Sequence, residues 1–176
     1  MDKRIVWISR TAVLIALMVV LQAVTAPLGY TLLTGSVVNL MLVVSVMTCG
    51  LATGLSVSVI APIVSKLLGI GPLWGLIPFI ALGNIVLALL WHVIGNRKPE
   101  RKYVAYIIAL VVAAAAKFLV LYTGIVRIAV PVLLGLPEKQ AAVISGMYSY
   151  TQIITALIGG AVAIIILPTL KKAIKR

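Results

Sequence analysis

Carboxylates are almost missing from this chain. Among its 176 residues the acidic side chains are Asp2, Glu100 and Glu138, against fifteen lysines and arginines. None of the three lies inside an apolar segment, whereas proton- and sodium-coupled carriers usually place an Asp or Glu within the membrane. The single cysteine, Cys49, excludes an internal disulfide, and the single histidine, His92, leaves too few ligands for a zinc site. We therefore expect no metal and no cofactor.

Two sequence signatures are missing as well. The Gly-rich GxxxxGK[ST] phosphate loop does not occur, so the chain is not expected to hydrolyse ATP by itself. Ten-residue segments of alternating polarity, typical of membrane β-barrels, do not occur either. What is present is apolar: 63% of residues are hydrophobic, 10% are charged, and the mean hydropathy is +1.24. This composition predicts an all-α integral membrane protein with one transmembrane domain, residues 1–176.

Six apolar segments are expected to cross the membrane as a compact bundle. The first segment resembles a signal peptide, but Pro27 stands where cleavage would fall, so a retained span is expected. Turn-forming residues predict a first loop over 27–36 and a loop or re-entrant piece over 131–140. The predicted spans cover residues 5–26, 36–48, 51–68, 73–94, 103–124 and 141–167, and Pro168 is expected to begin a C-terminal tail.

The distribution of lysine and arginine predicts the orientation of the bundle. Alternate loops must face the same side, and the N-terminus, the 97–102 loop and the C-terminus together hold most of the basic residues. By the positive-inside rule both termini are cytoplasmic, which requires an even number of spans. The positive charge is thus attributed to topology, and no nucleic-acid partner is expected. The basic residues on the predicted cytoplasmic side are Lys3, Arg4, Arg10, Arg97, Lys98, Arg101, Lys102, Lys171, Lys172, Lys175 and Arg176. Those in the other loops and span ends are Lys66, Lys117, Arg127 and Lys139.

Lys117 is the least expected of these charges, because it lies within the apolar stretch 113-AAAAKFLVLYTGIVR-127. At 1.5 Å per helical residue it lies roughly 21 Å from the cytoplasmic end of its span, in the outer half of a ~30 Å core. No acidic side chain is available at that depth. We therefore predict an outward-facing, water-accessible pocket of positive charge that suits a carboxylate, a phosphate or a strongly accepting heterocycle.

Other polar and aromatic side chains are expected in the same half of the membrane. Tyr148, Gln152, Thr155 and Gly159 recur at i, i+4, i+7 and i+11, which is one stripe of a helix. Alternatives remain for each candidate: the lysine and arginine can snorkel to the interface, the asparagines can bond between helices, and the aromatic residues can form an interfacial belt. The predicted substrate-binding residues are Lys117, Asn84, Tyr148, Gln152, Arg127, Asn39, Trp74 and Tyr122.

Small residues mark a candidate surface for a protein partner. Ala12 and Ala16 are four residues apart and share one face of the first span, a small-xxx-small pattern that allows close helix approach. Gly50 and Gly54 repeat the pattern at the start of the third span. The alternative is that these residues pack within the same bundle.

A family resemblance follows from these features. The short six-span chain, the AxxxA of its first span, and the segments 34-TGSVVNLMLVV-44, 59-VIAPIVSKLLGIGP-72 and 78-PFIALGNIVLALLW-91 together resemble the substrate-binding S-component of an energy-coupling factor (ECF) transporter. The likeness covers essentially the whole chain, although its motifs are loose. The motifs of the biotin, riboflavin and thiamine members are not found, so the ligand stays open.

The resemblance implies a function and a set of partners. S-components capture vitamins outside prokaryotic cells and dock onto a transmembrane coupling protein that carries two ATPase subunits. In this chain Ala12, Ala16, Gly50 and Gly54 would be docking residues, and Tyr30 or Thr34 would lie in a gating loop above the pocket. The resemblance thus implies that the chain is a non-enzymatic subunit of an importer in the prokaryotic cytoplasmic membrane.

Two other functions stay open at this level. An autonomous facilitator or channel subunit would need a polar path through both halves of the bilayer, and the inner halves of the last three spans are almost wholly apolar. An integral membrane enzyme would need catalytic carboxylates or a His/Cys pair, and the three carboxylates lie in loops or tails.

Overall fold

The computed structural model describes residues 2–97 and 102–174, and this part of the chain folds into helices joined by short connections. Four of the basic residues used in the topology argument, Lys98, Arg101, Lys175 and Arg176, lie outside the described residues, as does Glu100. The helices are α1 (Lys3–Thr25), η1 (Ala26–Leu28), α2 (Thr31–Cys49), α3 (Leu51–Leu67), η2 (Trp74–Leu76), α4 (Ile77–Gly95), α5 (Lys102–Leu121), η4 (Tyr122–Leu133), α6 (Glu138–Met147) and α7 (Tyr150–Ile174).

The predicted all-α class is confirmed for the described residues, and their arrangement is compatible with a multi-pass membrane bundle. Five helical segments are long and apolar enough to cross a membrane, namely Lys3–Leu28, Thr31–Cys49, Trp74–Gly95, Lys102–Leu133 and Glu138–Ala173. The third predicted span corresponds to α3, which has only 17 residues and falls below that length. The number six therefore stays a prediction.

The C-terminal end of the fifth predicted span is wrong. The helix does not stop at Gly124 but continues from α5 into η4, a π-helical stretch that ends at Leu133. Its last backbone bond runs from the amide of Leu134 to the carbonyl of Ala129, an i→i+5 spacing. Gly124 serves packing rather than termination, since a Cβ there would lie 2.6 Å from the ring of Phe79. The loop predicted over 131–140 is reduced to residues 134–137.

The sixth predicted span is two helices. A break at Tyr148 and Ser149 separates α6 from α7, and α7 continues through Pro168 to Ile174, so the expected tail is helical in its described part. The first predicted loop is also shorter than expected, because α2 already begins at Thr31. The turn before it is made by η1 and Gly29, whose φ of 73° suits glycine.

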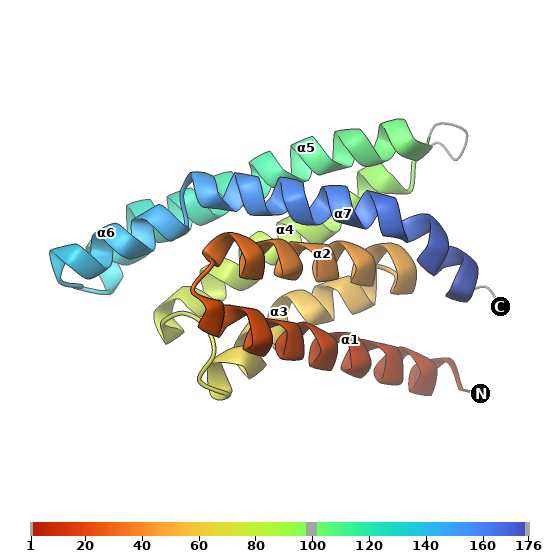
Figure 1. The fold of residues 1–176 in the computed structure, drawn as a ribbon, viewed down its shortest axis with the longest axis horizontal. Helices are drawn as coiled ribbons and strands as arrows, with labels where there is room; N and C mark the ends of the chain where they lie inside the picture. The colour runs from red at the N-terminus through yellow and green to blue at the C-terminus, as the bar shows by residue number, and fades with distance from the viewer. Residues whose placement is uncertain (1, 98–101, 175–176) are drawn as a thin grey trace.

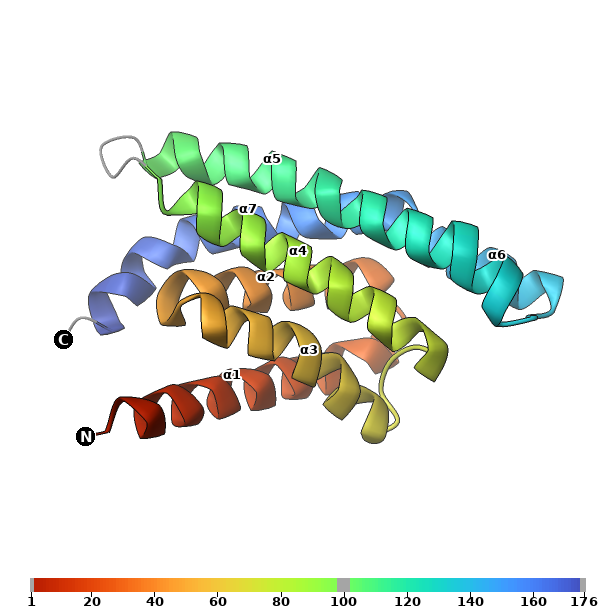
Figure 2. The same ribbon diagram turned by 180° about the vertical axis from the view of Figure 1, so that it is seen from behind.

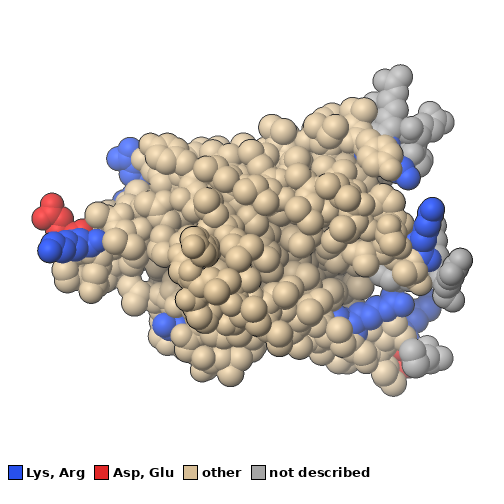
Figure 3. Space-filling model, in the orientation of Figure 1, with Lys and Arg blue, Asp and Glu red and all other residues tan. Residues whose placement is uncertain are grey.

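The long helices lie side by side in an elongated bundle (Figures 1 and 2). Both termini lie at one end of it, here called the terminal end, and η1, η2 and α6 form the opposite or far end. On the face shown in Figure 3, basic side chains gather at the two ends, and the belt between them shows no charged side chain. Large apolar side chains such as Val13, Leu82, Ile107 and Ile165 are exposed on that belt, as expected of a lipid-facing surface.

Two apolar cores divide the bundle interior. The larger lies toward the terminal end and includes Met18, Leu42, Leu87, Trp91 and Ala113. The smaller lies toward the far end, around Leu76, Leu121, Ile125 and Ala129 with Phe79 and Ile80 packed against it. Lys117 follows the large-core residues of α5 and precedes the small-core ones, and Asn84 holds the corresponding place on the antiparallel α4. Polar residues therefore form a layer between the two cores.

Close packing of α2 against α7 sets the position of this layer. A Cβ at Gly159 of α7 would overlap the backbone of Ser36 and lie 2.8 Å from the amide nitrogen of Leu40. At Gly35 of α2 a Cβ would lie 2.8 Å from the Thr155 methyl group. The predicted stripe on the last helix thus faces α2 at Thr155 and Gly159, while the Gln152 side chain bonds to the carbonyl of Met147 and Tyr148 precedes the helix.

Candidate functional site

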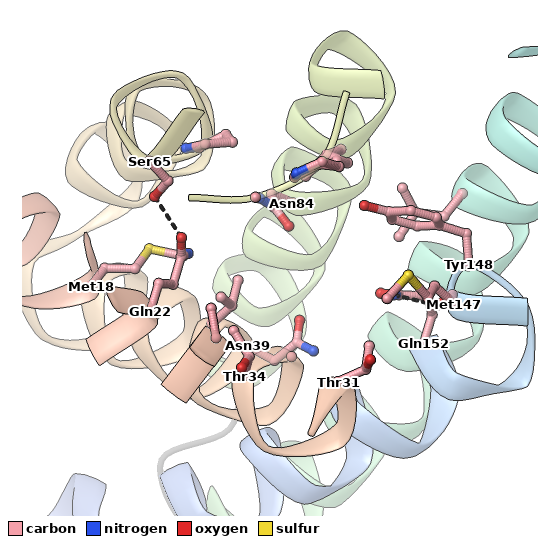
Figure 4. A pocket seen from close by; sticks show the side chains of 18 of the residues that line it. Met18, Gln22, Thr31, Thr34, Asn39, Ser65, Asn84, Met147, Tyr148 and Gln152 are labelled. Carbon is pink, nitrogen blue, oxygen red and sulfur yellow. Dashed lines mark hydrogen bonds between the residues drawn. The ribbon is translucent and has the colours of Figure 1, made fainter. Parts of the chain in front are cut away.

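A cavity of about 400 Å³ lies next to the large core, on the side toward the far end of the bundle (Figure 4). Its volume is within the range of small-molecule sites, ~300–1,000 Å³. The residues that line it come from all the long helices and from the connections at the far end. Met18 and Val38 of this lining belong to the large core or pack against it, so the large core borders the cavity on its terminal side. The lining residues are Met18, Gln22, Ala26, Gly29, Tyr30, Thr31, Thr34, Gly35, Val38, Asn39, Pro62, Ser65, Gly71, Pro72, Ile80, Asn84, Lys117, Leu121, Met147, Tyr148 and Gln152.

Lys117 lies in this lining and is only 3% exposed. Its ammonium donates to Oδ1 of Asn39 at 2.6 Å and to Oδ1 of Asn84 at 2.7 Å. The side chain therefore ends inside the bundle instead of extending to the interface. An ammonium has three N–H donors, and among the described residues only these two asparagines accept from it, which leaves one donor for the cavity.

The two asparagines are themselves held by neighbouring helices. Asn39 of α2 donates through Nδ2 to Oγ1 of Thr155 on α7, at 3.2 Å. Asn84 of α4 donates through Nδ2 to the carbonyl of Ser58 on α3, at 3.5 Å. Because each amide nitrogen is engaged in this way, each amide oxygen faces the ammonium. The network joins α2, α3, α4, α5 and α7, and no buried polar side-chain atom in the described part of the chain lacks a partner.

Two glutamines lie on opposite walls of the cavity. Ser65 of α3 donates its hydroxyl to Oε1 of Gln22 on α1, and Gln152 of α7 donates through Nε2 to the carbonyl of Met147 at 2.9 Å. Gln22 therefore keeps its Nε2 donor for the cavity, and Gln152 keeps its Oε1 acceptor. Figure 4 shows these side chains around the space that Tyr148 reaches with its hydroxyl.

Five of the predicted substrate-binding residues are brought together at this cavity: Lys117, Asn39, Asn84, Tyr148 and Gln152. The gating-loop candidates also line it, but their setting differs from the expectation. Tyr30 is 68% exposed and immediately precedes α2, whereas Thr34 lies within the first turns of α2 and not in a loop. The helix begins earlier than predicted because no proline or glycine interrupts residues 30–34.

Three predicted residues do not line the cavity. The guanidinium of Arg127 lies over the ring of Tyr122, 5.4 Å from its centroid, and Arg127 is exposed. Trp74 is 53% exposed on the surface of the far end. Tyr122 and Arg127 lie in η4, whose buried residues include Ile125 and Ala129, and neither of the two lines the cavity.

The sequence-based predictions did not include four lining residues of the cavity, Gln22, Ser65, Met18 and Thr31. Gln22 carried a usable signal, since it is a long polar side chain in an otherwise apolar predicted span. Ser65 carried little, because serine is common in membrane helices and bonds to its own backbone, as Ser58 does here to Gly54. Met18 and Thr31 have no feature that distinguishes them in sequence.

The small-residue candidates separate into two groups. Ala12 and Ala16 are exposed on α1, beside a second, apolar groove of about 540 Å³ between α1, α2 and α7 that includes Val13 and Leu17. Gly54 is buried, and a Cβ there would lie 2.7 Å from Cβ of Val46 on α2. Gly54 thus serves packing within the bundle, while Gly50 makes the turn between α2 and α3 with a φ of 89°.

The cavity has a simple electrostatic character. Among the described residues, Lys117 is the only charged side chain that lines it, and none of those lining residues carries a carboxylate, imidazole or thiol. Within residues 2–97 and 102–174, no three His, Cys, Asp or Glu side chains come together as metal ligands. The site is therefore suited to a small molecule that interacts with one positive charge and with the amide and hydroxyl groups of the lining.

Comparison with known proteins adds no relative, since no family model, no curated protein and no solved structure matches the chain.

Proposed function

We propose that this protein is the substrate-binding subunit of an ECF-type importer, which captures a small vitamin-like solute outside a prokaryotic cell. The observation that carries the proposal is Lys117, a buried ammonium held by two amide oxygens at the edge of a ligand-sized cavity. A lysine at the centre of a membrane helix costs on the order of 2.5–3.5 kcal/mol on insertion scales. Intramembrane charges of this kind are by default functional.

The closed terminal side of the cavity supports capture rather than free passage. Met18, Leu42, Leu87, Trp91 and Ala113 fill the interior beyond the polar layer, and all five are fully or almost fully buried. These apolar side chains do not provide the polar path that an autonomous facilitator would need. Passage of the solute would instead require rearrangement driven by partners.

We further propose that the partners are a transmembrane coupling protein and two ATPase subunits. Support comes from Ala12 and Ala16, whose small side chains face away from the bundle on α1. Small residues spaced in this way allow close contact with another membrane helix. In the proposed orientation the termini are cytoplasmic, and the cavity at the far end faces outside.

Native mass spectrometry of the purified chain with a mixture of water-soluble vitamins tests this function. One compound should bind with 1:1 stoichiometry, and Val38→Trp should abolish binding because the larger side chain fills the cavity. Leu68→Trp, at an exposed position outside the lining, is the matched control and should bind normally. Solute flux in liposomes that contain this chain alone would contradict the proposal and favour a facilitator.

A further inference from the structure

The charge of the cavity limits the ligands it can accept. Building on the proposed function, we infer that the substrate is a small organic monoanion, a monocarboxylic acid with a compact and largely apolar body whose carboxylate contacts Lys117. In the described part of the chain, one positive charge lines the cavity and no negative one does. A ligand with one negative charge makes the occupied site neutral, which is the arrangement that a poorly solvated interior favours.

The geometry at the ammonium supports a single acceptor. Asn39 and Asn84 occupy two of the three N–H donors of Lys117, at 2.6 and 2.7 Å. The remaining donor suits one oxygen of a carboxylate, and a hydrogen bond between two charged groups is stronger than one between neutral groups. The asparagine oxygens meanwhile fix the ammonium before the ligand arrives, so little side-chain ordering is left for the binding step.

Phosphate esters and cations are disfavoured by the same lining. A phosphate monoester carries a charge of about −1.5 to −2 at pH 7 and has three strong acceptor oxygens. Lys117 would neutralise only part of that charge, since Lys66 and Arg127 do not line the cavity. A cationic ligand would meet Lys117 with no carboxylate in the lining to compensate.

The rest of the lining describes the body of the ligand. Met18, Val38, Ile80 and Leu121 present apolar surface in the lining of the cavity. Farther apart, the Nε2 donor of Gln22 and the Oε1 acceptor of Gln152 lie on opposite walls. The substrate should therefore carry few polar groups besides its acid, with an acceptor toward α1 and a donor toward α7.

A thermal-unfolding and affinity screen of the full chain in lipid nanodiscs tests this inference. The probes are four libraries with matched apolar bodies: monocarboxylic acids, their primary amides, the corresponding phosphate monoesters and the corresponding amines. The variants are Lys117→Gln, which replaces the ammonium with neutral amide N–H donors and so removes the charge, and Lys66→Gln as the control outside the cavity. Val38→Trp reports whether a compound binds in the cavity at all.

Carboxylates are expected to raise Tm more than the other three classes in the wild type and in Lys66→Gln. Lys117→Gln should bind them roughly tenfold to hundredfold more weakly, the loss expected for a hydrogen bond to a charged group. Tighter cavity binding of phosphate esters, amines or amides in the wild type would overturn the inference and leave the proposed function intact. So would unchanged carboxylate affinity in Lys117→Gln. No cavity binding in any class would contradict both.

Discussion

At the scale of single residues, the central feature is one lysine with two amide acceptors. Asn39 and Asn84 are separated from Lys117 by 78 and 33 positions along the chain, yet their oxygens both lie within 2.7 Å of its ammonium. Sequence reasoning could identify all three as unusual, because each is polar in an apolar segment. It could not identify their pairing, which depends on how α2, α4 and α5 pack.

A double-mutant cycle on Lys117 and Asn84 tests that pairing. Asn84→Ala should lower the free energy of unfolding in the wild-type background, because it leaves the ammonium with one protein acceptor. The same change should matter less when Lys117 is already Met, with a coupling of about 1.5–3 kcal/mol, typical of a charged hydrogen bond. Unfolding of the four proteins in mixed micelles measures the coupling.

Asn96→Ala serves as the control for this cycle, because Asn96 is exposed at the terminal end and bonds only to His92 among the described side chains. It should show no coupling to Lys117. A coupling near zero for Asn84 as well would mean that its hydrogen bond to the ammonium does not form in the membrane.

At the scale of helices, boundaries were the least predictable part of the fold. Gly124 and the 131–140 segment suggested an ending and a loop, but Gly124 is required for contact with Phe79 and the helix passes through Pro131. The break between α6 and α7, at Tyr148 and Ser149, contains neither proline nor glycine. Such boundaries are set by tertiary packing, which outweighs local propensity and cannot be read from one sequence.

A methyl group should have opposite effects at Gly159, in the contact of α2 with α7, and at Gly146, outside that contact. Gly159→Ala should destabilise the protein by about 1–3 kcal/mol, because the new methyl group overlaps the backbone of Ser36. Gly146→Ala is the matched change, since no atom lies within 4 Å of its added Cβ in helix α6, and it should stabilise by about 0.5–1 kcal/mol. Thermal unfolding of both variants measures the difference; an equal effect at the two sites would contradict the packing.

At the scale of the whole molecule, composition predicted the class and residue pattern predicted much of the cavity. Lys117, Asn39 and Asn84 come from different helices, and all three line the cavity toward the far end of the bundle. Arg127, Tyr122 and Trp74 were assigned to the site by depth alone. They lie elsewhere because depth along a helix does not specify which face points inward.

The proposed partner surface predicts a separation of transport from binding. Ala12→Trp and Ala16→Trp should abolish uptake in cells that hold the coupling protein, while leaving solute binding by the purified variants unchanged. The reason is that both side chains are exposed on α1 and neither lines the cavity. Ile107→Trp, on the exposed face of α5, is the control and should transport normally. Loss of binding in the α1 variants would place those residues in bundle packing instead.

The most direct test of the account is whether the cavity opens to the outside of the cell. Replacement of the single cysteine, Cys49→Ser, allows one new thiol at a time, at Thr34 in the cavity lining or at exposed Asn96 near the terminal end. In intact cells a membrane-impermeant maleimide should label Thr34→Cys, and should label Asn96→Cys only after permeabilisation. Labelling of Thr34→Cys that requires permeabilisation would contradict an outward-facing binding site.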